Sequence, residues 1–188
     1  MVAGNEDEWE AQAASSTKVL VLGGTGFVGS RVVAKLQAMG VEVVSTSRDG
    51  RDGTVALDVT APGTNVASKV ESLAKGCSAV ISTIGAIGTA DDATVNAASG
   101  LAAQGAKAAG VDRFVYIAVA PEVKEFAKDI DFLKPYLKGK TFSMDSIASA
   151  FASSSTLIEP TFIHGGDKFQ APGIVGRSLE HPNTPQGW

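Results

Sequence analysis

Residues 18–29 read Lys-Val-Leu-Val-Leu-Gly-Gly-Thr-Gly-Phe-Val-Gly, an apolar run that breaks into closely spaced glycines. Gly24, Gly26 and Gly29 give the spacing G-x-G-x-x-G, and Gly23 stands directly before them. Adjacent glycines allow a tight turn off a strand, and Gly26 lets the backbone approach a phosphate with no Cβ in the way. Gly29 lets a helix pack close to the strand, so that the N–H groups of its first turn face a pyrophosphate. Because a strand pattern precedes the glycines and a helical pattern follows, the stretch predicts dinucleotide binding, with an empty glycine-rich turn as the alternative.

Length and composition narrow the classes of protein to which the chain can belong. Its 188 residues, 44% of them hydrophobic, suit one compact domain. A net charge of −4 and the lack of a basic cluster argue against a nucleic-acid partner. Cys77 is the only cysteine, which is compatible with a reducing compartment, and His164 and His181 show no metal-ligand spacing, so no metal site is expected. No apolar run approaches the ~20 residues of a transmembrane helix, so we expect a soluble protein.

Apolar runs alternate with helical stretches along the chain. The pattern predicts strands at 19–22, 41–46, 55–59, 79–84, 113–119 and 155–158, and helices at 27–39, 66–75, 91–109 and 135–152. Such alternation favours an α/β fold with a parallel sheet that helices cover on both faces. With a phosphate loop after the first strand, we expect the doubly wound arrangement known as the Rossmann fold.

A single domain is expected over residues 18–165, between two segments of different composition. Residues 1–17 form a polar N-terminal arm that lacks the arginines of a transit peptide and the apolar stretch of a signal peptide. Residues 166–188 are rich in Pro and Gly, and we expect an irregular tail there. The apolar residues Phe169, Ile174 and Trp188 leave packing of this tail on the domain open.

The second expected strand ends at Ser47 and Arg48, where an NAD-preferring site usually has an acidic residue for the ribose 2′-hydroxyl. A guanidinium at this place suits a 2′-phosphate through its charge and bidentate geometry. The sequence therefore favours NADP over NAD. Arg48 is alternatively a solvated loop arginine, and the nearby Asp49 and Asp52 weaken the distinction between the two cofactors.

Further cofactor contacts are expected in the loops that follow the other strands. Asp58 follows the third strand, where its carboxylate accepts from the adenine amino group or forms a turn before Thr60. Gly85 ends the fourth strand, where it lets the chain pass close to the cofactor ribose or is an ordinary strand-end glycine. With the glycine loop these positions form the expected cofactor-binding set: Gly23, Thr25, Gly26, Phe27, Val28, Gly29, Ser47, Arg48, Asp58, Val59, Thr83, Ile84 and Gly85.

Over residues 18–165 the chain resembles the atypical and extended branches of the short-chain dehydrogenase/reductase family. The resemblance is carried by the glycine loop and by residues 46–48, 57–60, 79–85, 109–117 and 159–165. It implies that the loop at 159–165 lies against the nicotinamide end of the cofactor, with Pro160 and Phe162 in contact. The chain is most similar in style to plant and algal plastid-associated NAD(P)-binding proteins. This similarity implies a plastid location, either in the stroma or peripheral to a membrane complex, with a cytoplasmic one as the alternative.

The chemistry of this family uses a Tyr-x-x-x-Lys pair, which Tyr136 and Lys140 match. Side chains four residues apart on a helix lie on one face. The resemblance implies that the Lys140 ammonium favours the phenolate form of Tyr136 and holds the nicotinamide ribose, while Tyr136 exchanges a proton at a substrate oxygen. Asn96 resembles the structural asparagine of the family or is a surface residue. Ala118, however, stands where the family has its catalytic serine.

Two functions follow from these features, and both stay open at the level of sequence. The Tyr136 and Lys140 pair favours an NADP-dependent oxidoreductase or isomerase that acts on a small carbonyl or hydroxyl compound. Loss of the serine hydroxyl at Ala118 costs on the order of 3 kcal/mol in the transition state. Together with a C-terminal substrate lobe truncated to a short tail, this loss favours a catalytically silent nucleotide-binding subunit of a larger assembly. A nucleotide-sensing regulator is a third alternative.

Overall fold

The structure, a computed structural model, describes residues 17–165, and it contains one six-stranded sheet whose neighbouring strands pair in parallel. The strands are β1 (Lys18–Leu22), β2 (Glu42–Ser47), β3 (Val55–Ala56), β4 (Ala79–Ser82), β5 (Arg113–Ile117) and β6 (Ser155–Ile158). Their order across the sheet is β3-β2-β1-β4-β5-β6, so the direction of winding reverses between β1 and β4. This order confirms the doubly wound Rossmann fold. Most of the expected N-terminal arm and all of the expected tail lie outside the described residues.

Helices connect most of these strands. They are α2 (Phe27–Ala38), α3 (Val66–Leu73), α4 (Asp92–Ala108), α5 (Pro121–Ala127), the 3₁₀ helix η1 (Asp131–Leu133) and α6 (Lys134–Ala150). Gly40 and Gly110, which follow the ends of α2 and α4, both have positive φ, as the sequence pattern predicts for helix ends. The short helix α5 was not predicted, because seven residues that begin at Pro121 offer little helical periodicity.

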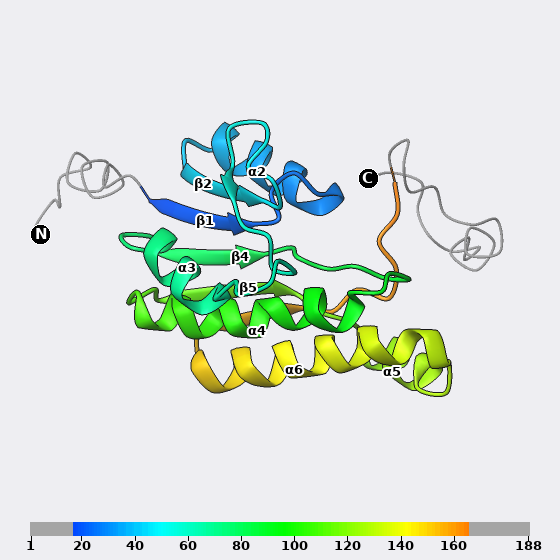
Figure 1. The fold of residues 1–188 in the computed structure, drawn as a ribbon. Helices are drawn as coiled ribbons and strands as arrows, with labels where there is room; N and C mark the ends of the chain where they lie inside the picture. The colour runs from blue at the N-terminus through cyan, green and yellow to red at the C-terminus, as the bar shows by residue number, and fades with distance from the viewer. Residues whose placement is uncertain (1–16, 166–188) are drawn as a thin grey trace, which may run out of the picture.

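Helices α3, α4 and α6 lie on one face of the sheet, as Figure 1 shows. The main core lies beneath them and includes the fully buried Phe114 and Tyr116 of β5. Helices α4 and α6 pack closely, since a Cβ at Gly139 of α6 would stand 2.6 Å from the Ala93 carbonyl oxygen of α4. Gly139 is therefore a packing residue, although glycine weakens a helix by itself.

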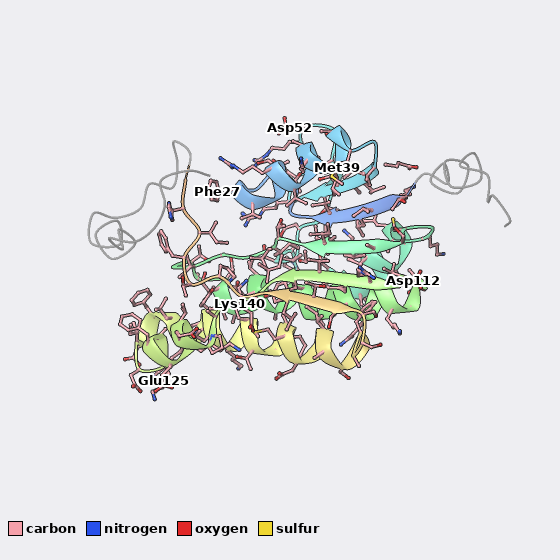
Figure 2. The ribbon with its side chains drawn as sticks, turned by 180° about the vertical axis from the view of Figure 1, so that it is seen from behind. Phe27, Met39, Asp52, Asp112, Glu125 and Lys140 are labelled. Carbon is pink, nitrogen blue, oxygen red and sulfur yellow. The ribbon has the colours of Figure 1, made fainter. Side chains whose placement is uncertain are left out.

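The second face of the sheet differs from the sequence prediction. Within residues 17–165, α2 is the helix on this face, and it lies beside β1 and β2, whereas β4 to β6 face outward with no helix in front of them (Figure 2). The expectation of helices over both faces is thus met only in part. None of the helices between residues 17 and 165 has the length and apolar character that a membrane span requires.

The third strand is also shorter than predicted, with two residues in place of five. Leu57 still donates its backbone N–H to the Ser47 carbonyl oxygen at 2.7 Å. The chain then leaves the sheet, because the Asp58 carboxylate accepts hydrogen bonds from the backbone N–H and the hydroxyl of Thr60 and closes a turn.

Candidate nucleotide-binding site

The glycine loop leaves β1 in a turn that β2 and β4 hold in place. Gly23 has φ +81°, a left-handed conformation that favours glycine. The backbone N–H of Gly24 donates to the Thr46 carbonyl oxygen at 2.8 Å, and that of Gly26 donates to the Gly23 carbonyl oxygen at 3.0 Å. From β4, the Thr83 hydroxyl lies 2.9 Å from the Leu22 carbonyl oxygen and 3.2 Å from that of Gly23. The loop is therefore fixed on both sides.

Helix α2 begins at Phe27, directly after this loop. Gly26 is its N-cap and offers no side chain to cap the helix, and the first turn contains no acidic residue. The N–H groups of such an uncapped first turn, with the positive end of the helix dipole, attract phosphate. Gly29 brings the helix against the loop, because a Cβ there would stand 2.1 Å from the Gly23 carbonyl oxygen. Gly26 has more room, since the only atom that its ideal Cβ would meet within 4 Å is the same oxygen, at 3.2 Å.

A cavity of about 500 Å³ lies beside this loop, where the central strands end. Its lining residues are Gly23, Thr25, Gly26, Thr46, Ser47, Arg48, Asp49, Arg51, Leu57, Val59, Thr83, Ile84, Gly85 and Val95. Nine of these, all except Thr46, Asp49, Arg51, Leu57 and Val95, belong to the set expected from the sequence. The volume is within the range of small-molecule and cofactor sites. A glycine cradle, a helix N-terminus and two arginines suit the phosphates of a dinucleotide.

Arg51 is a cavity residue that the sequence analysis missed. Its guanidinium Nη2 lies 3.5 Å from the Thr25 hydroxyl oxygen across the cavity. Its Nη1 lies 3.7 Å from a carboxylate oxygen of Asp49, so the acidic residue beside Arg48 faces a cation. The signal was present, since residues 48–53 repeat Arg-Asp-Gly and place a second arginine three residues after the first.

Ser47 lines the cavity, but its hydroxyl already has partners within the β2–β3 loop. These partners are the Asp49 carboxylate at 3.2 Å, the Gly50 backbone N–H at 2.9 Å and the Thr54 hydroxyl at 2.7 Å. Together they use the one donor and two acceptor positions of a serine hydroxyl. We therefore interpret Ser47 as a residue that shapes the loop and so positions the two arginines.

Asp58 forms the turn before Thr60 that the sequence offers as the alternative to an adenine contact. Hydrogen bonds from the Thr60 hydroxyl at 2.7 Å and the Thr60 backbone N–H at 2.9 Å lower the pKa of its carboxyl. Asp58 does not line the cavity, whereas its neighbours Leu57 and Val59 do. The apolar side chains of these neighbours suit a flat, apolar ring face better than a hydrogen-bonded contact.

Lys140 does not line the cavity but lies behind Gly85, which does. An ideal Cβ at Gly85 would be 3.5 Å from the Lys140 ammonium and 3.3 Å from Asn96 Oδ1. The ammonium is buried and donates to the Ile117 carbonyl oxygen at 2.8 Å, between α6 and β5 (Figure 2). Burial lowers the pKa of Lys140 from its ordinary 10.5 to about 8. Asn96 is fully buried and donates to the carbonyl oxygens of Ala86 and Asp92, so it holds the loop after β4 against α4.

Tyr136 and Lys140 share a face of α6, as their spacing predicts. The Lys140 ammonium lies 5.8 Å from the centre of the Tyr136 ring. Burial, and then the Asp92 carboxylate, raise the pKa of Tyr136. This direction differs from the phenolate expected from the family resemblance. Tyr136 is thus a neutral phenol at neutral pH.

The remaining expected residues lie elsewhere. Ala118 is buried and carries no hydroxyl, and its backbone N–H donates to the Ile158 carbonyl oxygen at 2.8 Å. Pro160 accepts a hydrogen bond from Ala120, and Phe162 is 47% exposed, so neither of these two lines the cavity. Phe27 and Val28 line a second cavity, of about 470 Å³, on the flank of α2.

Comparison with known proteins identifies the family. The sequence profile of a family described as NAD(P)H-binding matches residues 23–178. The chain belongs to this NAD(P)H-binding family. The matched range includes the glycine loop, the two arginines and the Tyr136–Lys140 pair. The cavity therefore lies in the part of the chain that matches a family of NAD(P)H-binding proteins.

Among curated relatives, an uncharacterized chloroplastic protein of Arabidopsis thaliana is 31% identical over 182 residues. The alignment covers 88% of this chain but 58% of the relative, so the chain spans little more than half of that protein's length. The expectation of a resemblance to a plant plastid protein is confirmed by this relative.

Solved structures show the same fold. A short-chain dehydrogenase/reductase superfamily protein from Agrobacterium tumefaciens with bound NAD has a TM-score of 0.57 at 24% identity, covering 76% of this chain and 48% of that one. The enzyme WbmH of Bordetella bronchiseptica in complex with NAD+ has a TM-score of 0.62 at 21% identity, covering 83% and 59%. The oxidoreductase ylbE from Lactococcus lactis has a TM-score of 0.61 at 22% identity, covering 77% and 68%.

Proposed function

We propose that the protein binds NADP(H), with the adenosine ribose between Arg48 and Arg51. The observation that carries this proposal is the pair of arginines that line the cavity beside the glycine loop. A 2′-phosphate placed between two guanidinium groups gains charge-assisted hydrogen bonds that a 2′-hydroxyl cannot make. Two carboxylates of this loop already face Arg51, that of Asp49 at 3.7 Å from Nη1 and that of Asp52 at 3.8 Å from Nε.

Single substitutions of the two arginines test this proposal. Arg48→Ala and Arg51→Ala should each weaken NADPH binding about tenfold, and NADH binding much less, because a hydrogen bond to a charged group contributes about 1.5–3 kcal/mol. Arg113→Ala is the matched control, since Arg113 is exposed and begins β5 at the end of the strand away from the cavity. Isothermal titration calorimetry measures both affinities for each variant. Equal losses for NADPH and NADH would contradict a 2′-phosphate contact.

We further propose that the bound cofactor serves reduction of a small carbonyl compound. NADPH supplies a hydride when it is bound. Tyr136, whose raised pKa keeps its phenol protonated, donates a proton to the carbonyl oxygen, and solvent then restores the phenol. Lys140 stays buried behind Gly85, where it holds the end of β5 through the Ile117 carbonyl oxygen and faces the ribose position.

Turnover of NADPH with a panel of aldehydes and ketones tests the reductase proposal. Tyr136→Phe should remove turnover and leave NADPH affinity within about threefold of the wild-type value, because the phenol acts on substrate only. Ala118→Ser is a useful counterpart, since it restores a hydroxyl where the resembling family has its catalytic serine. Turnover that survives Tyr136→Phe would contradict the assigned proton donor.

A catalytically silent subunit is the second candidate, and Ala118 is the observation that favours it. Without a hydroxyl at the end of β5, a substrate oxygen lacks one oriented donor, and removal of such a donor typically costs 10²–10³ in turnover. Tight NADPH binding without turnover, and recovery of the chain in a large complex from native extract, would support this candidate. We propose plastids as the location, because the curated relative is described as chloroplastic, and fractionation with an antibody tests this location.

A further inference from the structure

Burial decreases from β1 to β6 across the face of the sheet that carries α2. Strand register places Val21, Ile81, Val115 and Thr156 in one row across β1, β4, β5 and β6. Val21 is fully buried, Ile81 and Val115 are half-buried, and Thr156 is exposed. Because α2 lies beside β1 and β2, this decrease indicates that its full cover does not extend beyond β1 to β4.

The opposite face shows no such gradient over β4 and β5. Phe114 and Tyr116 of β5 are fully buried there beneath the helices, whereas Ile117 on the α2 side is half-buried and its register partner Ile158 is 47% exposed. Figure 2 shows β4, β5 and β6 with no helix in front of them. We name this surface the open face, and its residues are Ala79, Ile81, Val115, Ile117, Thr156 and Ile158.

An open apolar face is unusual in a parallel sheet, because parallel sheets are normally buried on both sides. The apolar members of the open face alternate with buried core residues along the same strands, which is the pattern of strands covered on both sides. The open face therefore needs an apolar cover that residues 17–165 do not supply.

The described chain ends beside this surface. Ile163, His164 and Gly165 line the second cavity together with the flank of α2, where Val28, Val32 and Leu36 provide apolar side chains. The described chain therefore stops at the helix that shares this side of the sheet. The cover can thus start where the described chain stops.

We propose that residues 166–188 pack across the open face and the adjacent flank of α2. This segment contains the apolar residues Phe169, Ile174, Val175, Leu179 and Trp188. The distance across the open face from β4 to β6 is only ~10 Å, because neighbouring strands lie ~4.8 Å apart. The 23 residues of the segment can reach well beyond this distance at ~3.3 Å per residue. The family match also continues to residue 178, thirteen residues past Gly165, so the conserved domain includes part of this segment.

Photo-crosslinking of the full chain tests this proposal. The crosslinker p-benzoylphenylalanine replaces Phe169 in one preparation and Ile174 in another, and mass spectrometry locates the attached peptides. Equal amounts of ¹⁴N-labelled and ¹⁵N-labelled chain distinguish links within one molecule from links between two copies. We expect links within one molecule to peptides that carry open-face residues or α2.

Lysine substitutions supply the specificity test. Ile158→Lys should shift the docking equilibrium at least tenfold towards the undocked state, because one buried isoleucine contributes about 1.5–3 kcal/mol, and so reduce the yield of these links. Val55→Lys is the matched control, because Val55 is also an exposed strand residue, at 41%, but lines a cavity beside α3. Thr156→Lys replaces Ile158→Lys if that variant does not fold. Links between copies, links to residues 1–16, or a yield that neither open-face lysine lowers would overturn the proposal.

Discussion

Gly29→Ala is a demanding test of how the nucleotide loop is built, because one methyl group would enter a space that backbone atoms already fill. The ideal Cβ at Gly29 lies 2.1 Å from the Gly23 carbonyl oxygen and 2.7 Å from the Thr83 hydroxyl oxygen. The Gly23 carbonyl oxygen cannot retreat freely, since it accepts a hydrogen bond from Gly26 at 3.0 Å. The substitution must therefore move α2 away from the loop.

The expected loss of stability follows from this geometry. Overpacking usually costs about 1–3 kcal/mol, and contacts with backbone place Gly29→Ala at the upper end of that range. For a domain of this size each kcal/mol lowers Tm by about 2–4 °C, so we expect a decrease of about 6–12 °C. Displacement of the helix N-terminus should also weaken NADPH binding at least tenfold, because its N–H groups no longer point at the phosphates.

Gly26→Ala is the matched control for this prediction. Gly26 has φ −74°, which alanine adopts without strain, and its ideal Cβ meets only the Gly23 carbonyl oxygen at 3.2 Å. Its Tm should stay within about 4 °C of the wild-type value, the shift expected for 1 kcal/mol. NADPH affinity should still decrease at least tenfold, because the methyl group occupies the approach of the pyrophosphate. Thermal denaturation followed by circular dichroism, with an NADPH titration, measures both effects. A Gly29→Ala variant that melts and binds like wild type would refute the reasoning.

Three other substitutions probe the surroundings of the cavity. The pKa of Lys140 is about 8 in the folded protein and 10.5 ordinarily, so between these two pH values the unfolded chain binds more protons than the folded one. The free energy of unfolding should therefore rise with pH over this range. Urea denaturation should show a rise of up to about 3 kcal/mol in wild type relative to Lys140→Met, and parallel curves would contradict the buried ammonium. Thr83→Val removes the hydroxyl that holds the glycine loop, so Tm should decrease by about 2–4 °C, and an unchanged Tm would count against those hydrogen bonds. Gly139→Ala should lower Tm despite the higher helix propensity of alanine, because its Cβ would lie 2.6 Å from the Ala93 carbonyl oxygen, and a raised Tm would show that α4 and α6 can separate.

Local signals made the core of the site predictable from sequence. The strand, the glycines and α2 follow one another within residues 18–38, so spacing alone predicts where phosphates bind. Tyr136 and Lys140 were equally predictable as neighbours, because four residues on one helix fix their relation.

Contacts between distant segments were the part that sequence could not supply. Arg51 reaches the Thr25 hydroxyl only because the β2–β3 loop folds over the cavity. The partners of the Ser47 hydroxyl, and the direction of the pKa of Tyr136, depend on burial and on side chains that periodicity does not place. Similarly, the open face results from which strands α2 covers, because β4 and β5 by themselves have the apolar pattern of strands covered on both sides.

Calorimetric titration of the unmodified chain with NADPH and with NADH tests the central proposal most directly. Two guanidinium groups at the ribose predict NADPH binding at least tenfold tighter than NADH binding, a difference of about 1.4 kcal/mol or more. The preference should shrink as salt is raised, because the arginines are exposed and their attraction for the 2′-phosphate is screened. Equal affinities, or tighter binding of NADH, would contradict the assignment of this cavity to NADP(H).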